Sequence, residues 1–132
     1  MNRTIIFSVK GNQYNIDFPT VGQFIQMESR RMILSKGTYR DLISSNMISS
    51  FQAYQLIDMV VTLEAICPKL IADLKVDSIE ELDLFDSLEL LEDYIKVVNP
   101  WTNDWRKTLR KKSDIINGIS EPEENNEEKE NN

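Results

Sequence analysis

FQAYQLIDMVVTLEAI, residues 51–66, is the most hydrophobic long stretch of the sequence, and it decides the fold. Its apolar side chains form two rows at helical spacing: Phe51, Tyr54, Ile57 and Val61, and Ala53, Leu56, Val60 and Leu63. Residues spaced by three and four lie on one face of an α-helix. The pattern therefore predicts a helix with a broad apolar face at the centre of the core, interrupted or restarted at Pro68.

The segment before this helix predicts two further helices. Thr20 and Gln23 have the spacing of a capping box, which opens a helix that runs to about Leu34. Lys36-Gly37 is its expected stop, because glycine readily takes the left-handed backbone conformation at a helix end. The apolar residues of this helix at helical spacing are Val21, Phe24, Ile25 and Met32. Thr38 and Asp41 then frame a second, short helix.

The segment after the central helix predicts two more. Asp77-Ser78 opens a short acidic turn, and Asp86 is the expected cap of a helix from residue 87 to about 97. Its expected inward side chains are Leu88, Leu91, Tyr94 and Ile95. Pro100 predicts the end of this helix, because the residue before a proline is pushed out of the helical region. Trp101 and Trp105 share a face of the helix that follows.

The N-terminus has the alternation of a β-hairpin. Large side chains alternate with smaller or polar ones on both sides of Gly11-Asn12: Ile5, Phe7, Val9, Tyr14, Ile16 and Phe18. With Gly11-Asn12 as the two-residue turn, Val9 faces Tyr14, and all six large side chains lie on one face. An isolated hairpin is marginal in water. This face must therefore pack on the helices or on another subunit.

The charge is uneven along the 132 residues. Residues 1–112 hold 14 Lys and Arg against 15 Asp and Glu, whereas residues 113–132 hold one Lys against seven Asp and Glu. A polar, acidic segment of this kind buries too little surface to offset its ordering entropy. We therefore expect one mostly α domain over residues 1–112, a hairpin packed on a compact bundle of about five helices. Residues 113–132 are expected to form a disordered acidic tail.

Several function classes are disfavoured by composition. The chain has no histidine, the commonest general base and transition-metal ligand, and Cys67 is its only cysteine. Its four glycines are too scattered for a phosphate-binding loop. The acidic residues between 77 and 93 interleave with leucines as a solvated helix face does. The sequence predicts a cytoplasmic protein that is no enzyme, holds no metal or cofactor and does not span a membrane.

The candidate binding residues lie on the last predicted helix: Trp101, Trp105, Arg106, Lys107 and Arg110. The two tryptophans either anchor this helix in the core or form an exposed binding centre, in which tryptophan and arginine are common. The basic run to Lys112 could contact phosphates, but the near-neutral body and acidic tail disfavour nucleic acid. An acidic protein partner, or screening by the tail, is the favoured alternative.

The layout of the chain resembles the tail assembly chaperones of tailed bacteriophages. The similar features are the strand KGNQYNIDF, the helix TVGQFIQMESRRMILSKGTY that follows it, and a polar tail after WRKTLRKK. The resemblance spans about residues 4–112 and rests on layout, with no diagnostic motif.

This resemblance implies a non-enzymatic protein of the host cytoplasm that holds the tape-measure protein soluble and recruits tail-tube subunits. It also implies self-association and an apolar surface for a helical client. Adaptable contacts could come from Met27, Met32, Met47 and Met59. Two alternatives stay open: a structural accessory or connector of the virion, and a host-directed adaptor or regulator.

Overall fold

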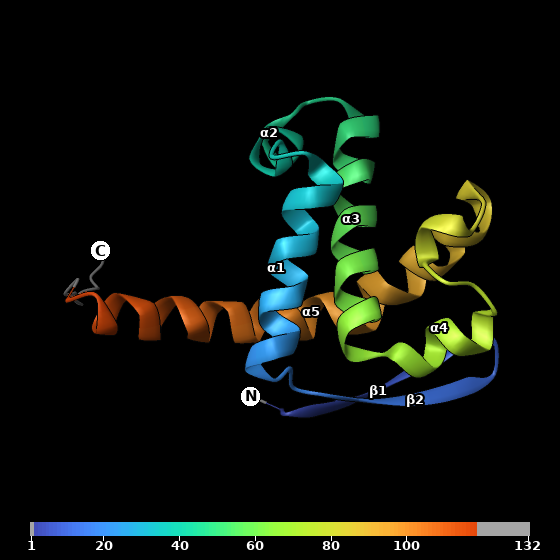
Figure 1. Ribbon diagram of the computed structural model, residues 1–132, viewed down its shortest axis with the longest axis horizontal. Helices are drawn as coiled ribbons and strands as arrows, with labels where there is room; N and C mark the ends of the chain where they lie inside the picture. The colour runs from blue at the N-terminus through green and yellow to red at the C-terminus, as the bar shows by residue number, and fades with distance from the viewer. Residues whose placement is uncertain (1, 119–132) are drawn as a thin grey trace. The chain divides into compact units, whose positions relative to one another are not determined.

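The computed structural model describes residues 2–118, which fall into two compact units, residues 2–99 and residues 100–118. Within them lie β1 (Thr4–Val9), β2 (Asn12–Asp17), α1 (Val21–Ser35), α2 (Tyr39–Ser44), α3 (Ile48–Ile66), α4 (Pro68–Leu74), the short 3-10 helix η1 (Ile79–Glu81) and α5 (Leu84–Ile116). The expected mostly helical fold with an N-terminal hairpin is confirmed (Figure 1).

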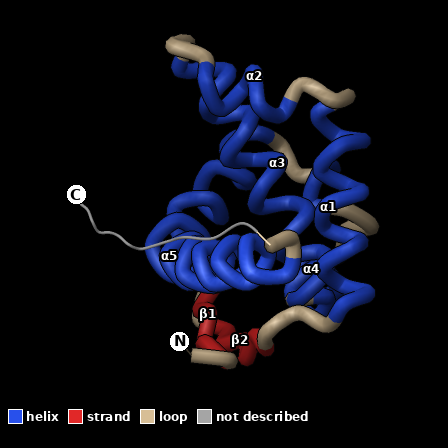
Figure 2. Tube along the Cα trace, turned by 90° about the vertical axis from the view of Figure 1, so that its left-hand side faces the viewer, coloured by secondary structure: helices blue, strands red, loops and turns tan. Residues whose placement is uncertain are grey.

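Helix α3 is the centre of the first unit, as its sequence predicts. It lies antiparallel beside α1 and also contacts α2, α4 and η1 (Figures 1 and 2). Almost every side chain of its second half is buried, Met59 and Leu63 completely. The helix ends at Ile66, and Pro68 begins α4 at a first-turn position, where its missing N–H costs no hydrogen bond.

The hairpin forms with a different turn from the one expected. Phe7 pairs with Tyr14 and Val9 with Asn12, so that Lys10-Gly11, not Gly11-Asn12, is the turn. Both turn residues have positive φ, 49° and 84°, as a type I′ turn requires. The shift moves every pairing by two residues and therefore keeps the same side chains on the same face.

The apolar face of the hairpin packs within its own chain. Phe7 and Ile16 are fully buried, whereas Ile6 on the opposite face is 57% exposed. The hydroxyl of Tyr14 donates a 2.7 Å hydrogen bond to Asp73 of α4. The alternative that this face packs on another subunit is thereby excluded for these residues.

Helix α1 begins and ends as its sequence predicts. The side chain of Thr20 accepts from the backbone of Gln23, and that of Gln23 accepts from the backbone of Thr20, which completes the capping box. At the other end, Lys36 takes the left-handed conformation and Gly37 follows with φ 80°. The buried residues of α1, however, are Met27, Arg31 and Ser35, while Met32 is 67% exposed.

Helix α5 corrects three expectations. Asp83, not Asp86, caps it: the Asp83 side chain accepts from the backbone N–H of Asp86 at 2.8 Å. Pro100 lies inside the helix, which therefore does not stop there. Pro100 removes one backbone hydrogen bond and strains the residue before it. The helix nevertheless continues, because many other backbone hydrogen bonds form on each side of Pro100. Ile95, expected inward, is 36% exposed, and Leu90 and Val98 are buried instead.

The C-terminal part of α5 extends beyond the expected domain end at residue 112. The helix continues to Ile116, so residues 113–116 of the expected tail are helical. The rest of the tail prediction, from residue 119, lies outside the described residues.

Candidate functional site

Six exposed apolar side chains lie on the end of α1, on α2 and its following loop, and on the start of α3. These three segments meet at one end of the first unit, away from the hairpin (Figures 1 and 2). We call the group the apolar end; it consists of Met32, Ile33, Ile43, Met47, Ile48 and Phe51. Their exposed fractions run from 43% for Phe51 to 78% for Ile48. A contiguous exposed apolar patch is a candidate interaction surface.

The methionines divide between core and surface. Met27 and Met59 are fully buried, whereas Met32 and Met47 are 67% and 64% exposed at the apolar end. The flexible, polarizable thioether side chain adapts to irregular partner surfaces. Two of the four methionines considered from the sequence are thus exposed to solvent.

A buried polar network fixes α1 against α3 and α5 behind this end. Arg31 donates to Asp58 at 2.7 Å and also pairs with Glu28, and its guanidinium lies 5.2 Å from the ring centre of Tyr39. Tyr94 donates to the other oxygen of Asp58 at 2.9 Å. Burial by itself lowers the pKa of Arg31, but the charge of Asp58 raises it, and the net pKa lies above its usual value.

A second network holds η1 beside α3. Arg30 of α1 reaches Glu64 at 3.1 Å and Glu80 at 2.9 Å. Glu64 also accepts from the hydroxyl of Ser78 at 2.6 Å and from the backbone N–H of Ile79 at 2.8 Å. These bonds fix the position of η1, which forms one wall of a groove.

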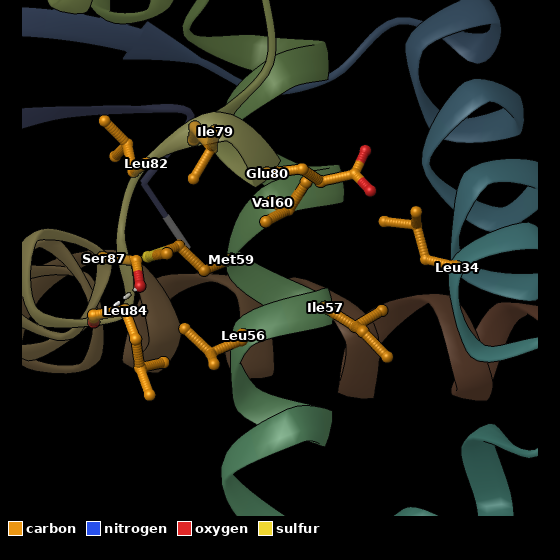
Figure 3. A pocket seen from close by; sticks show the side chains of 10 residues that line it. All are labelled: Leu34, Leu56, Ile57, Met59, Val60, Ile79, Glu80, Leu82, Leu84 and Ser87. Atoms are coloured by element: carbon orange, nitrogen blue, oxygen red, sulfur yellow. Dashed lines mark hydrogen bonds between the residues drawn. The ribbon is translucent and has the colours of Figure 1, made fainter.

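That groove has a volume of about 370 Å³ and an apolar lining (Figure 3). Its lining residues come from α1, α3, η1 and the start of α5: Leu34, Leu56, Ile57, Met59, Val60, Ile79, Glu80, Leu82, Leu84 and Ser87. Glu80 and Ser87 are its polar members. Phe85, which follows Leu84 in sequence, is 83% exposed.

A second hollow of about 230 Å³ shares Leu82 with this groove. Its apolar lining consists of Val9, Leu74, Leu82 and Leu90, and its charged lining of Lys10, Asp86, Glu89 and Asp93. The three acids are spaced by three and four along α5 and therefore share one face. The two hollows meet at Leu82, and we call them together the acidic groove because their apolar lining is accompanied by Glu80, Asp86, Glu89 and Asp93.

The five residues predicted as a binding site are separated by burial. Trp101 and Trp105 are buried and meet edge to face with ring centres 6.1 Å apart. Arg106 is partly buried with its guanidinium 5.4 Å from the ring centre of Trp105. Lys107 and Arg110 are exposed. The two tryptophan rings are therefore covered, and the exposed side chains of Lys107 and Arg110 are what a partner can reach.

The thiol of Cys67 is not placed for nucleophilic chemistry. Cys67 is buried, and burial raises the pKa of its thiol, which disfavours the thiolate. Among residues 2–118, no three side chains of the metal-binding types gather as a metal site would require. None of the described helices is both long and apolar enough to cross a membrane.

No family model, no curated protein and no solved structure matches the chain. Sequence reasoning named Met32 and Met47 as possible contacts, but it missed the other members of the apolar end and the acidic groove. The acidic groove is assembled from elements that lie far apart in the chain, whereas the apolar end comes from three consecutive elements whose exposed faces depend on how they pack. A helix as short as α2, with six residues, has little surface to bury, and none of its residues is buried. The apolar spacing of α1, in contrast, groups Met32 with Val21, Phe24 and Ile25 and does not indicate that Met32 is exposed.

Proposed function

We propose that this protein is a non-enzymatic binding protein that holds a helical client at its apolar end. The observation that carries the proposal is the exposure of six large apolar side chains at one end of a unit whose interior is otherwise well packed. Leaving Ile48 78% exposed is unfavourable in water unless a partner covers it. A helical client suits such a surface, because an amphipathic helix presents a matching apolar stripe.

Within this class, we propose the role of a phage tail assembly chaperone. What supports it is the resemblance in layout, together with Met32 and Met47 at the apolar end. Methionine-rich surfaces can accept different helical segments of one long client. The client would then be the tape-measure protein, with tail-tube subunits recruited later.

The test is co-expression with a phage tape-measure protein as the helical client. The wild-type chain is expected to keep the client soluble and to copurify with it. A double variant, Ile33→Glu with Ile48→Lys, should lose both effects, because it places charges in the apolar contact. The matched control is Ile6→Lys on the exposed face of the hairpin, 57% exposed, which should retain both.

Two results would contradict the proposal. If the double variant holds the client as well as the wild-type chain does, the apolar end is not the binding surface. If the protein is abundant in purified particles, it is a structural component of the virion and not a chaperone.

A further inference from the structure

Two features of the described residues are complementary in charge and in apolar character. One is the acidic groove of the first unit, and the other is the C-terminal end of α5, residues 106–116. We propose that the end of α5 of one copy of this chain docks in the acidic groove of a second copy. This interaction goes beyond the proposed function, because it uses neither the apolar end nor a client.

The end of α5 carries an apolar stripe whose exposure increases along the helix. Trp105 is fully buried, Leu109 is 37% exposed and Ile116 is 81% exposed. These residues are four and seven apart, and so they lie on the same face of the helix. Ile115 beside them is 76% exposed. A face that is buried at Trp105 therefore continues as an uncovered apolar surface over about two further turns.

The same helix end is strongly basic. Lys107, Arg110, Lys111 and Lys112 are all exposed, and Asp114 is the acidic residue among positions 106–116. The helix end thus combines exposed positive charge with exposed isoleucines. At 1.5 Å per residue, these 11 positions span about 16 Å, enough to cover a groove formed by neighbouring helices.

The acidic groove offers the opposite charge around an apolar floor. Asp86, Glu89 and Asp93 line one part of it and Glu80 the other, with Lys10 as the basic residue in the lining. Glu81 and Asp83, exposed and adjacent in sequence, add to the negative charge. An apolar helix without basic residues would leave these carboxylates uncompensated, whereas the end of α5 brings lysines and an arginine to them.

The two surfaces differ, so the contact would be head-to-tail. Such contacts close into a ring or continue as a chain, rather than stopping at a two-fold dimer. Because charge pairs at the rim are screened by salt, self-association should weaken as ionic strength rises. The acidic residues 121–130 lie outside the described residues, and the full chain is therefore the form to test.

The test measures the mass of the full chain in solution by sedimentation velocity over a range of concentrations. The wild-type chain is expected to exceed the mass of one chain at high concentration and low salt. Two charge reversals should each abolish this: Arg110→Glu with Lys111→Glu, and Asp86→Lys with Glu89→Lys. A mixture of the two variants should associate at least tenfold more tightly than either variant alone. In the mixture, the reversed helix end of one variant meets the reversed groove of the other, and the two unchanged surfaces also meet.

The matched control reverses charges on α2, Arg40→Glu with Asp41→Lys, both exposed, and should associate as the wild-type chain does. Circular dichroism verifies that every variant is folded. A wild-type chain that stays monomeric at every concentration would overturn the proposal. Self-association that survives either charge reversal would also overturn it. Binding of nucleic acid to the end of α5 in place of self-association would overturn it as well. None of these results depends on client binding.

Discussion

Arg31 and Asp58 form an ion pair in the interior of the first unit, with 2.7 Å between guanidinium and carboxylate and only 7% and 4% of their side chains exposed. The pair joins α1 to α3, and Tyr94 extends it to α5 through the second carboxylate oxygen. A buried charge without its partner is costly, so the three helices are held in one arrangement.

Replacing Asp58 by alanine should lower the free energy of unfolding by about 3–5 kcal/mol, because it leaves Arg31 buried without its partner. Urea denaturation followed by circular dichroism measures this. Glu80→Gln serves as the control: its ion pair with Arg30 lies at the surface, with 48% of the Glu80 side chain exposed, and should contribute about 0–1 kcal/mol. Equal losses in the two variants would contradict the structural role given to Asp58.

The hydrogen bond from Tyr14 to Asp73 predicts a dependence of stability on alkaline pH. Burial, followed by the hydrogen bond and charge of Asp73, raises the pKa of Tyr14 above 10.0. A raised pKa in the folded state stabilises the protein below the unfolded-state pKa, and this contribution is lost as pH rises through the folded-state pKa. Tyr14→Phe should therefore be less stable than wild type by about 1 kcal/mol at pH 8.

The difference between the two proteins should shrink above pH 10, when the unfolded-state tyrosine ionises. Denaturation of both proteins at several pH values measures it, and other ionising groups cancel in the comparison. A difference that is constant from pH 8 to pH 11 would show that the Tyr14 hydroxyl does not keep its proton in the way described.

The turn at Lys10-Gly11 predicts opposite effects of two substitutions. Gly11→Ala should destabilise by about 1–2 kcal/mol, because a β-carbon is unfavourable at φ 84°. Lys10→Asn should stabilise by up to about 1 kcal/mol, because asparagine tolerates the left-handed conformation and Asn-Gly favours a type I′ turn. Lys10→Gln removes the same charge without that gain and is the control. Thermal unfolding of the three variants ranks them.

Sequence reasoning succeeded where the signal is local or strongly periodic. The capping box at Thr20, the central helix through Met59 and the alternating face that contains Phe7 could all be predicted, since each depends on neighbours within a few residues. The hairpin register could not, because Lys10-Gly11 and Gly11-Asn12 are both acceptable two-residue turns. The two choices place the same side chains on the same face, so the apolar pattern cannot distinguish them.

The candidate site was harder to predict because it depends on distant partners. Arg31 is buried only because Asp58, 27 residues later, compensates its charge, and its burial turns Met32 to the surface. Pro100 was expected to end a helix, but α5 continues through it. The local preference of proline for a helix end is therefore outweighed by the helical turns on either side. The basic run at Lys107 and Arg110 was recognised as reachable, whereas the acidic groove that complements it comes from elements spread over the chain.

The division of the methionines between core and surface gives the last prediction. Met27→Ala and Met59→Ala should each destabilise by about 2–5 kcal/mol, because both side chains are fully buried and their removal leaves cavities. Met32→Ala and Met47→Ala remove the same atoms from exposed positions and should change the free energy of unfolding by no more than about 0.5 kcal/mol. Urea denaturation of the four variants measures both effects.

The exposed pair should nevertheless weaken client binding in the co-expression assay, because the contacts they lose are made only with a partner. The buried pair should affect binding only as far as they unfold the protein. If Met32→Ala and Met47→Ala destabilise the isolated chain as much as the buried pair, the apolar end is covered in solution. Its exposure would then no longer support a binding role.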